Sequence, residues 1–151
     1  MRIGAAALAC IALAVVGCGG GSNDKIHVTD LPRQCIGDSG GLLKALAAAP
    51  GPVRVDGEPI SQCFSRKHDS VEMQALGTGL LAAAETLGDR ARGGSDKAAL
   101  QLGYLVGAAE RGATRSGIAD ELIRRLQAET TLPARAQTAY ASGHRAGRAQ
   151  G

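Results

Sequence analysis

The amino-acid sequence predicts a mainly α-helical protein, a small bundle of about five helices with a short irregular or hairpin segment at residues 52–62 and one disulfide. Apolar residues recur at helical spacing through most of residues 70–130. Glycine, proline, serine and aspartate separate these stretches where helices would begin and end. Two cysteines remain to pair once the first 18 residues are set aside, and they supply the expected disulfide.

The first expected helix covers an apolar run at residues 42–49. Asp38 or Ser39 can cap its start, and the Pro-Gly pair at residues 50–51 ends it. After it, an Asp-Gly pair at residues 56–57 lies between apolar residues. This pattern favours a tight turn, and so a small hairpin within residues 52–62.

Two long helices follow. One starts at Asp69 or Ser70 and runs to about Arg92, and the next begins after Ser95, whose hydroxyl can cap it. The later helix carries apolar residues on a second face as well, so we expect it to be the most buried. The core-facing residues expected are Met73, Leu76, Leu80, Ala84 and Leu87 in the first of these helices, and Ala98, Leu102, Leu105, Val106 and Ala109 in the second.

A break at residues 112–117 precedes a fourth helix, which should end near Thr131. Pro133 can occupy the first turn of a fifth. Small residues on its inward face would let another helix approach closely, but glycine also weakens a helix, so we expect fraying near the C-terminus. The inward residues expected are Ile118, Leu122, Ile123 and Leu126 in the fourth helix, and Ala136, Ala139, Tyr140, Gly143 and Gly147 in the fifth.

The first residues have the pattern of a secretory signal. Met1 and Arg2 form a short positive segment, and residues 3–16 are continuously apolar. A run of this length suits a signal peptide better than a membrane-spanning helix, which needs about 20 apolar residues. Cys18 follows the small residue Gly17 directly.

These residues resemble the lipobox of bacterial lipoproteins over residues 1–18. The resemblance implies that residues 1–17 are removed, that Cys18 is lipidated, and that the protein is held at the cell membrane by a lipid anchor, facing outside the cytoplasm. A plain cleaved signal or an uncleaved anchor is the alternative. Residues 18–34 would then be the lipidated cysteine and a flexible linker that begins Gly-Gly-Gly-Ser. Residues 35–151 would form a single small helical domain.

Charge and composition argue against a nucleic-acid partner. Removal of residues 1–17 takes away Arg2 and no acidic residue, so the net charge falls from +3 to +2. The aromatic residues are one Phe and two Tyr, with no Trp. Single-stranded nucleic acid is usually bound by a basic groove with stacking aromatic rings, and this chain has neither.

Cysteine pairing strengthens the expected domain. With Cys10 removed and Cys18 lipidated, Cys35 and Cys63 remain, and two thiols outside the cytoplasm normally form a disulfide. A metal site would need partners such as His27 or His68, and the spacing of the cysteines is not that of a zinc site.

Residues 37–41 read Gly-Asp-Ser-Gly-Gly and are the sharpest catalytic candidate. The string resembles the nucleophile segment of trypsin-like serine proteases and satisfies the Gly-x-Ser-x-Gly elbow of α/β-hydrolases. The resemblance implies Ser39 as nucleophile, with His27 and Asp30 as the available upstream partners. The alternative is a helix cap beside a disulfide, which we favour because the chain lacks the β scaffold of either family.

His68 and Glu72 are four residues apart and could ligate a metal ion, although such a pair is more often a solvated first helical turn. His144, Arg145 and Arg148 form a small basic segment that could contact anionic lipid headgroups or remain solvated. No cofactor motif is present, and we expect none.

The sequence therefore favours a lipid-anchored envelope protein that is not an enzyme but an interaction or structural module, with an envelope protein as partner. The alternative is a small-molecule or metal-binding lipoprotein, for which a pocket among Met73, Tyr104 and Tyr140 would be evidence. A serine hydrolase that uses Ser39 ranks third.

Overall fold

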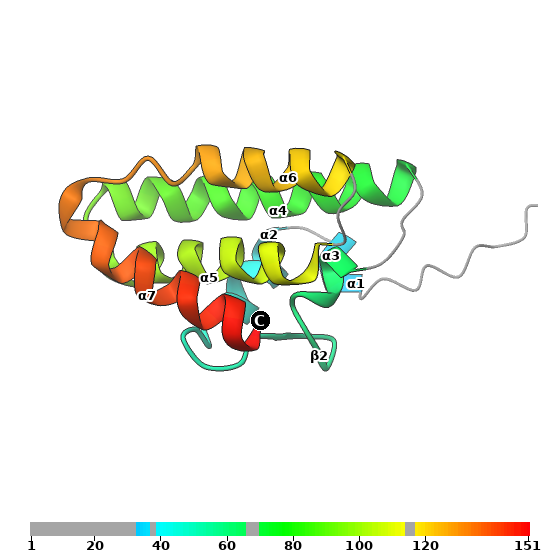
Figure 1. Ribbon diagram of the computed structural model, residues 1–151, viewed down its shortest axis with the longest axis horizontal. Helices are drawn as coiled ribbons and strands as arrows, with labels where there is room; N and C mark the ends of the chain where they lie inside the picture. The colour runs from blue at the N-terminus through cyan, green and yellow to red at the C-terminus, as the bar shows by residue number, and fades with distance from the viewer. Residues whose placement is uncertain (1–32, 37–38, 66–69, 114–116) are drawn as a thin grey trace, which may run out of the picture.

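The computed structural model describes residues 33–36, 39–65, 70–113 and 117–151. Its longest elements are α4 (Ser70–Arg92), α5 (Asp96–Gly112), α6 (Gly117–Ala128) and α7 (Ala134–Gln150). In Figure 1, α4 and α6 lie along one side of the molecule, and α5 and α7 lie along the other. The mainly α-helical prediction with one disulfide is confirmed.

Helix α5 is the centre of the bundle. It packs against α4, α6, α7 and the N-terminal elements, and most of its residues are buried all round the helix. Ser95 caps it, since the Ser95 hydroxyl accepts the Ala98 N–H at 3.2 Å. The expectation that this helix is the most buried is therefore confirmed. One of its buried residues is polar: Gln101 is 7 % exposed, and its side chain donates to the Leu46 carbonyl at 3.0 Å.

Helices α5 and α7 approach so closely that their facing positions must be glycine. A Cβ at Gly103 would collide with the backbone of Tyr140, and one at Gly143 would collide with the backbone of Leu100. Gly107 and Gly147 are equally close to the facing helix. Residue numbers rise together along the two helices at these contacts, so α5 and α7 are parallel. Helix α6, which comes between them in the sequence, runs in the opposite direction (Figure 1).

This contact changes one sequence-based expectation. Glycine was expected to fray the C-terminal end, but α7 stays helical to Gln150 in the structure. The reason is tertiary packing, because Gly143 and Gly147 are buried against α5. The close approach that they allow outweighs their low helix propensity.

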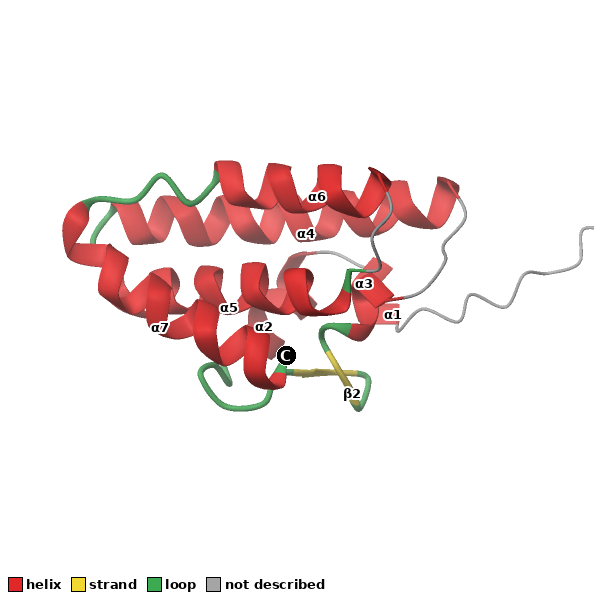
Figure 2. Ribbon diagram, in the orientation of Figure 1, coloured by secondary structure: helices red, strands yellow, loops and turns green. Residues whose placement is uncertain are grey.

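The N-terminal part consists of α1 (Arg33–Ile36), α2 (Ser39–Leu46), a two-stranded hairpin and α3 (Gln62–Ser65). Strands β1 (Arg54–Val55) and β2 (Glu58–Pro59) are antiparallel, as expected from the turn pattern. Asp56 and Gly57 both have positive φ, 51° and 88°, which matches the turn type that joins tight hairpins. Figure 2 shows the hairpin beside an otherwise helical fold.

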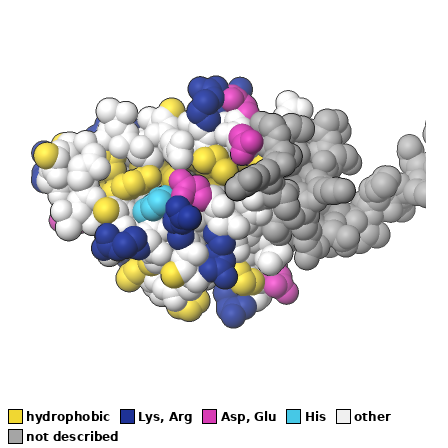
Figure 3. Space-filling view, viewed as in Figure 1, with side chains coloured by type: hydrophobic (Ala, Val, Ile, Leu, Met, Phe, Trp, Pro, Cys, Tyr) yellow, Lys and Arg dark blue, Asp and Glu magenta, His cyan; other side chains and the backbone are white. Residues whose placement is uncertain are grey.

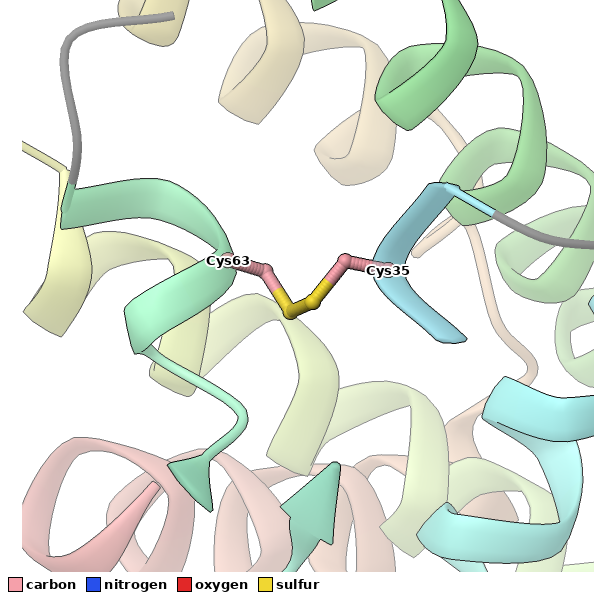
Figure 4. Close-up of a disulfide and its surroundings, with 2 residues drawn as sticks. All are labelled: Cys35 and Cys63. Atoms are coloured by element: carbon pink, nitrogen blue, oxygen red, sulfur yellow. A yellow bond between two sulfur atoms is a disulfide. The ribbon is translucent and has the colours of Figure 1, made fainter. Parts of the chain in front are cut away.

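The single-turn helices α1 and α3 were not expected from the sequence, which assigns Arg33 and Gln34 to the linker. Too few residues are involved for a helical apolar period to be visible. The Cys35–Cys63 disulfide joins α1 to α3 (Figure 4), with the two Cα atoms 5.8 Å apart and both side chains fully buried. Helix α1 packs on α4 and α3 packs on α5, so the disulfide links both ends of this region to the bundle.

Candidate functional site

Ser39 is the first residue of α2 and is partly buried. Its expected partners, His27 and Asp30, lie outside the described residues, as do Gly37 and Asp38. His144 is the only histidine in the described part of the chain, and it belongs to α7, where it contacts Glu110. The structure places Ser39 in the first turn of α2.

Other candidates from the sequence also lie outside the described residues. These are Cys18, which belongs to the undescribed residues 1–32, His68, and the side chain of Glu72 in α4. In the described ranges no group of three or more His, Cys, Asp or Glu side chains is arranged to hold a metal ion. None of the helices in those ranges has the length and apolar character that crossing a membrane requires.

A cluster of polar side chains joins α5, α6 and α7, and we call it the Glu110 cluster. The Glu110 carboxylate lies 3.0 Å from Nε2 of His144 and 3.4 Å from Nη1 of Arg148, and it accepts a bond of 3.1 Å from Gln127 Nε2. The side chains of Glu110 and His144 are 22 % and 26 % exposed. Figure 3 shows the histidine at the surface with acidic and basic side chains beside it.

Tyr140 extends this cluster by stacking on the His144 ring, with ring centroids 6.0 Å apart. Burial raises the pKa of the Tyr140 hydroxyl, the negative charge of Glu110 raises it further, and a hydrogen bond with Thr130 opposes the rise. The hydroxyl therefore stays protonated at neutral pH. Glu110 of α5 thus contacts side chains of both α6 and α7, and the arrangement holds these helices together.

The Glu110 cluster was missed in the sequence. His144 and Arg148 were interpreted as a basic segment, and the signal that could have corrected this is their spacing of four residues, which puts them on one helical face. Glu110 lies 34 residues earlier in the chain. Only the parallel packing of α5 on α7 brings it to that face.

The pocket among Met73, Tyr104 and Tyr140 that would favour ligand binding is not formed by the two tyrosines, because Tyr104 has a structural role. It is fully buried, and its hydroxyl oxygen accepts the backbone N–H of Val53 at 3.1 Å. The side chain thus joins α5 to the start of the hairpin. Tyr140 belongs to the surface cluster instead, and the side chain of Met73 lies outside the description.

Two of the surface hollows are lined by residues that the structure describes. The first, of about 310 Å³, lies between α4 and α6 and is lined by both apolar and polar side chains. The second, of about 650 Å³, is more open and lies between α2 and β1. The first is lined by Gln74, Gly77, Thr78, Leu81, Glu121, Leu122 and Arg125, and the second by Gly41, Lys44, Ala45, Ala48, Pro52 and Arg54.

Comparisons with models of known families, with curated proteins and with solved structures found no match for this chain.

Proposed function

We propose that the chain is a lipid-anchored extracytoplasmic protein whose helical domain is a non-catalytic interaction or structural module. The observation that carries the proposal is the sequence at residues 3–18, an apolar run followed by Gly17 and Cys18. The buried Cys35–Cys63 disulfide supports it, because disulfides persist in oxidising surroundings outside the cytoplasm.

The way polar side chains are used supports the structural part of the proposal. Glu110 binds side chains of α6 and α7, and Arg92 of α4 lies 3.4 Å from Glu129, which follows α6. Buried polar side chains are likewise engaged: Ser61 donates to the Gly151 carbonyl at 2.6 Å. These groups stabilise packing between elements, as expected for a rigid module.

The test is a pair of cysteine substitutions. Cys18→Ser should abolish lipidation and the cleavage that removes residues 1–17. The protein should then no longer be recovered in the membrane fraction in its mature form. Cys10→Ser, within the apolar run, is the matched control and should leave all three unchanged. Intact-mass measurement is the readout, and an unacylated wild-type protein that retains residues 1–17 would overturn the proposal.

A second candidate function, binding of a small molecule, is favoured by the hollow between α4 and α6. Its volume is at the lower end of the range for ligand pockets, and it combines apolar Leu81 and Leu122 with polar Thr78 and Arg125. Gly77→Leu would fill it. If the candidate is correct, a small molecule that co-purifies with the wild-type protein is absent from this variant, and identical small-molecule profiles would exclude it.

A further inference from the structure

Helix α7 has an unusual charge distribution. It contains Arg135, His144, Arg145 and Arg148 and no acidic residue over its 17 residues. Arg145 is exposed and makes no ion pair with a carboxylate in the described ranges. Figure 3 shows Lys and Arg side chains gathered on the face of the molecule where α7 lies.

Contacts at the end of α7 bring one further basic residue, Arg111, to the same place. Arg111 of α5 donates to the carbonyl of Arg148 at 2.9 Å and also to that of Ala149. Gln150 donates to the carbonyl of Pro50, in the turn that follows α2. The C-terminal end of α7 therefore lies against the segment that leads into the second hollow.

That hollow is basic. Lys44 and Arg54 line it, and both are exposed, above the apolar Ala45, Ala48 and Pro52. Lys44 makes no ion pair with a described carboxylate, and Arg54 donates to the Gly57 carbonyl at 2.7 Å. The contact between Gln150 and Pro50 connects this hollow to the end of α7, and we call the basic residues of the two places together the basic face: Lys44, Arg54, Arg111, Arg145 and Arg148.

Carboxylates on these elements offset the basic face only in part. Glu110 is already bound by His144 and Arg148, Asp56 lies in the hairpin turn, and Glu58 is the first residue of β2. The α4 and α6 side is different, because three of its arginines are paired with carboxylates. Arg124 and Arg125 both contact Glu121 at 2.8 Å, and Arg92 contacts Asp89 at 2.8 Å.

We propose that the basic face contacts the anionic lipid headgroups of the membrane to which the chain is attached, and so orients the domain with α7 and the α2–β1 hollow toward the bilayer. The inference rests on the membrane attachment proposed above. Cys18 is 15 residues before the start of α1, a stretch that spans at most about 50 Å when fully extended. Attachment there keeps the domain within reach of the surface.

The expected strength of the contact suits orientation and not anchoring. Each basic residue close to an anionic membrane surface favours association by about fivefold. A few such residues select one orientation of a protein that is already attached, and salt weakens the effect because the interaction is screened within about 10 Å at 0.1 M ionic strength.

The test uses the full-length protein purified from membranes and reconstituted into vesicles of phosphatidylcholine alone or with phosphatidylglycerol. Phenylglyoxal modifies accessible arginines, and mass spectrometry reads the extent at each site. Arg54, Arg145 and Arg148 should react several-fold more slowly in the phosphatidylglycerol vesicles at low salt. Arg124 and Arg125 are the internal controls, because their side chains are 71 % and 60 % exposed, close to the 63 % of Arg148.

The outcomes separate the two proposals. Protein that floats with vesicles but has the same arginine reactivity in both lipid mixtures would overturn the basic face and leave the attachment standing. Protection shared equally by Arg124 and Arg125 would also overturn it. Protein that floats with neither type of vesicle would overturn both proposals.

A charge-reversed variant gives an independent check. Lys44→Glu with Arg145→Glu should remove the protection of Arg54 and Arg148 without changing the melting temperature, because both side chains are exposed. The matched control is Arg90→Glu with Lys97→Glu, where α4 ends and α5 begins, which changes the net charge equally and should preserve protection. Loss of protection in both variants would show a net-charge effect and contradict a defined face.

Discussion

The Tyr104 hydroxyl makes a buried hydrogen bond that joins α5 to the residue before the hairpin. It accepts the Val53 N–H, and both residues are fully buried. Tyr104→Phe leaves that N–H without a partner, so we expect the free energy of unfolding to fall by about 1–3 kcal/mol. Urea denaturation of the two proteins measures the difference.

Tyr140→Phe is the control for this prediction. The Tyr140 side chain is only partly buried, so water can replace the hydrogen bond that its hydroxyl makes with Thr130. We therefore expect the free energy of unfolding to fall by less than about 1 kcal/mol. Equal losses in the two variants would mean that burial of the Val53 N–H is not what makes Tyr104 important.

At this scale the sequence predicts residues whose chemistry is local and misses those whose partners are distant. Ser95 was expected as a helix cap, and its bond to Ala98 spans three residues. Tyr104 and Val53 are 51 residues apart, and Glu110 and His144 are 34 apart. No periodicity in one segment can identify such a pair, because the partner is chosen by how the helices pack.

Two helical glycines, one in the contact between α5 and α7 and one in α4, should respond in opposite ways to substitution by alanine. At Gly143 an added Cβ would collide with the Leu100 backbone, and Gly143→Ala should therefore destabilise the protein by about 2 kcal/mol or more, since the two helices must separate. At Gly77 in α4 the nearest atom to an added Cβ is Leu122 Cδ1 at 3.9 Å, an ordinary contact. Gly77→Ala should stabilise by about 0.5–1 kcal/mol through helix propensity.

Thermal and chemical denaturation of the two alanine variants distinguish the packing effect from the propensity effect. If Gly143→Ala were as stable as the wild-type protein, α5 and α7 would not be in the close contact that the structure shows. Gly77→Ala is the matched control, because it adds the same methyl group to a glycine that is also within a helix.

Helix α6 supplies a prediction about pH. Hydrogen bonds from Arg124 and then Arg125 lower the pKa of Glu121 from its usual 4.5 to about 2. A carboxyl with a lowered pKa in the folded state stabilises the fold above pH 4.5, and this contribution is lost as the pH falls from 4.5 toward 2. The contribution is small, because the pair is exposed to solvent.

An NMR titration of the Glu121 carboxyl measures the shift directly. Arg124→Gln should raise the pKa back toward 4.5, since it removes the strongest of the hydrogen bonds responsible. A wild-type Glu121 that titrates near 4.5 would show that the contacts with Arg124 and Arg125 do not persist in solution.

At the scale of elements, length decides what the sequence can predict. The starts of the helices of 12 or more residues were expected close to where they are observed, because three or more turns make the apolar period visible, whereas α6 ends three residues before the expected Thr131. The hairpin was expected from the chemistry of its turn, Asp56-Gly57. Helices α1 and α3, with four residues each, carry no such signal.

For the whole molecule, the sequence predicts the class of fold but not the arrangement. Small residues at 143 and 147 were expected to allow close approach of a helix, yet the helix that approaches could be identified only from the structure. The basic face has the same origin. Its residues come from α2, β1, α5 and α7, and nothing in their spacing along the chain shows that they lie at one end of the bundle.

The stability of the whole domain should depend on the Cys35–Cys63 disulfide. It links α1 to α3, which are single turns with little surface of their own to bury, and it spans a sequence separation of 28 residues. In the chain-entropy model, closing a loop of this size stabilises the folded state by about 3.6 kcal/mol. Cys35→Ser with Cys63→Ser should lower the free energy of unfolding by about that amount, as measured by urea denaturation.

Reduction provides the control, because it should act through this bond alone. A reductant should lower the urea midpoint of the wild-type protein to that of the double variant and should leave the midpoint of the variant unchanged. A wild-type midpoint that does not move after complete reduction of Cys35 and Cys63 would mean that the bundle holds α1 and α3 by packing on α4 and α5. The domain would then have no need of an oxidising environment, and the disulfide would no longer support a location outside the cytoplasm.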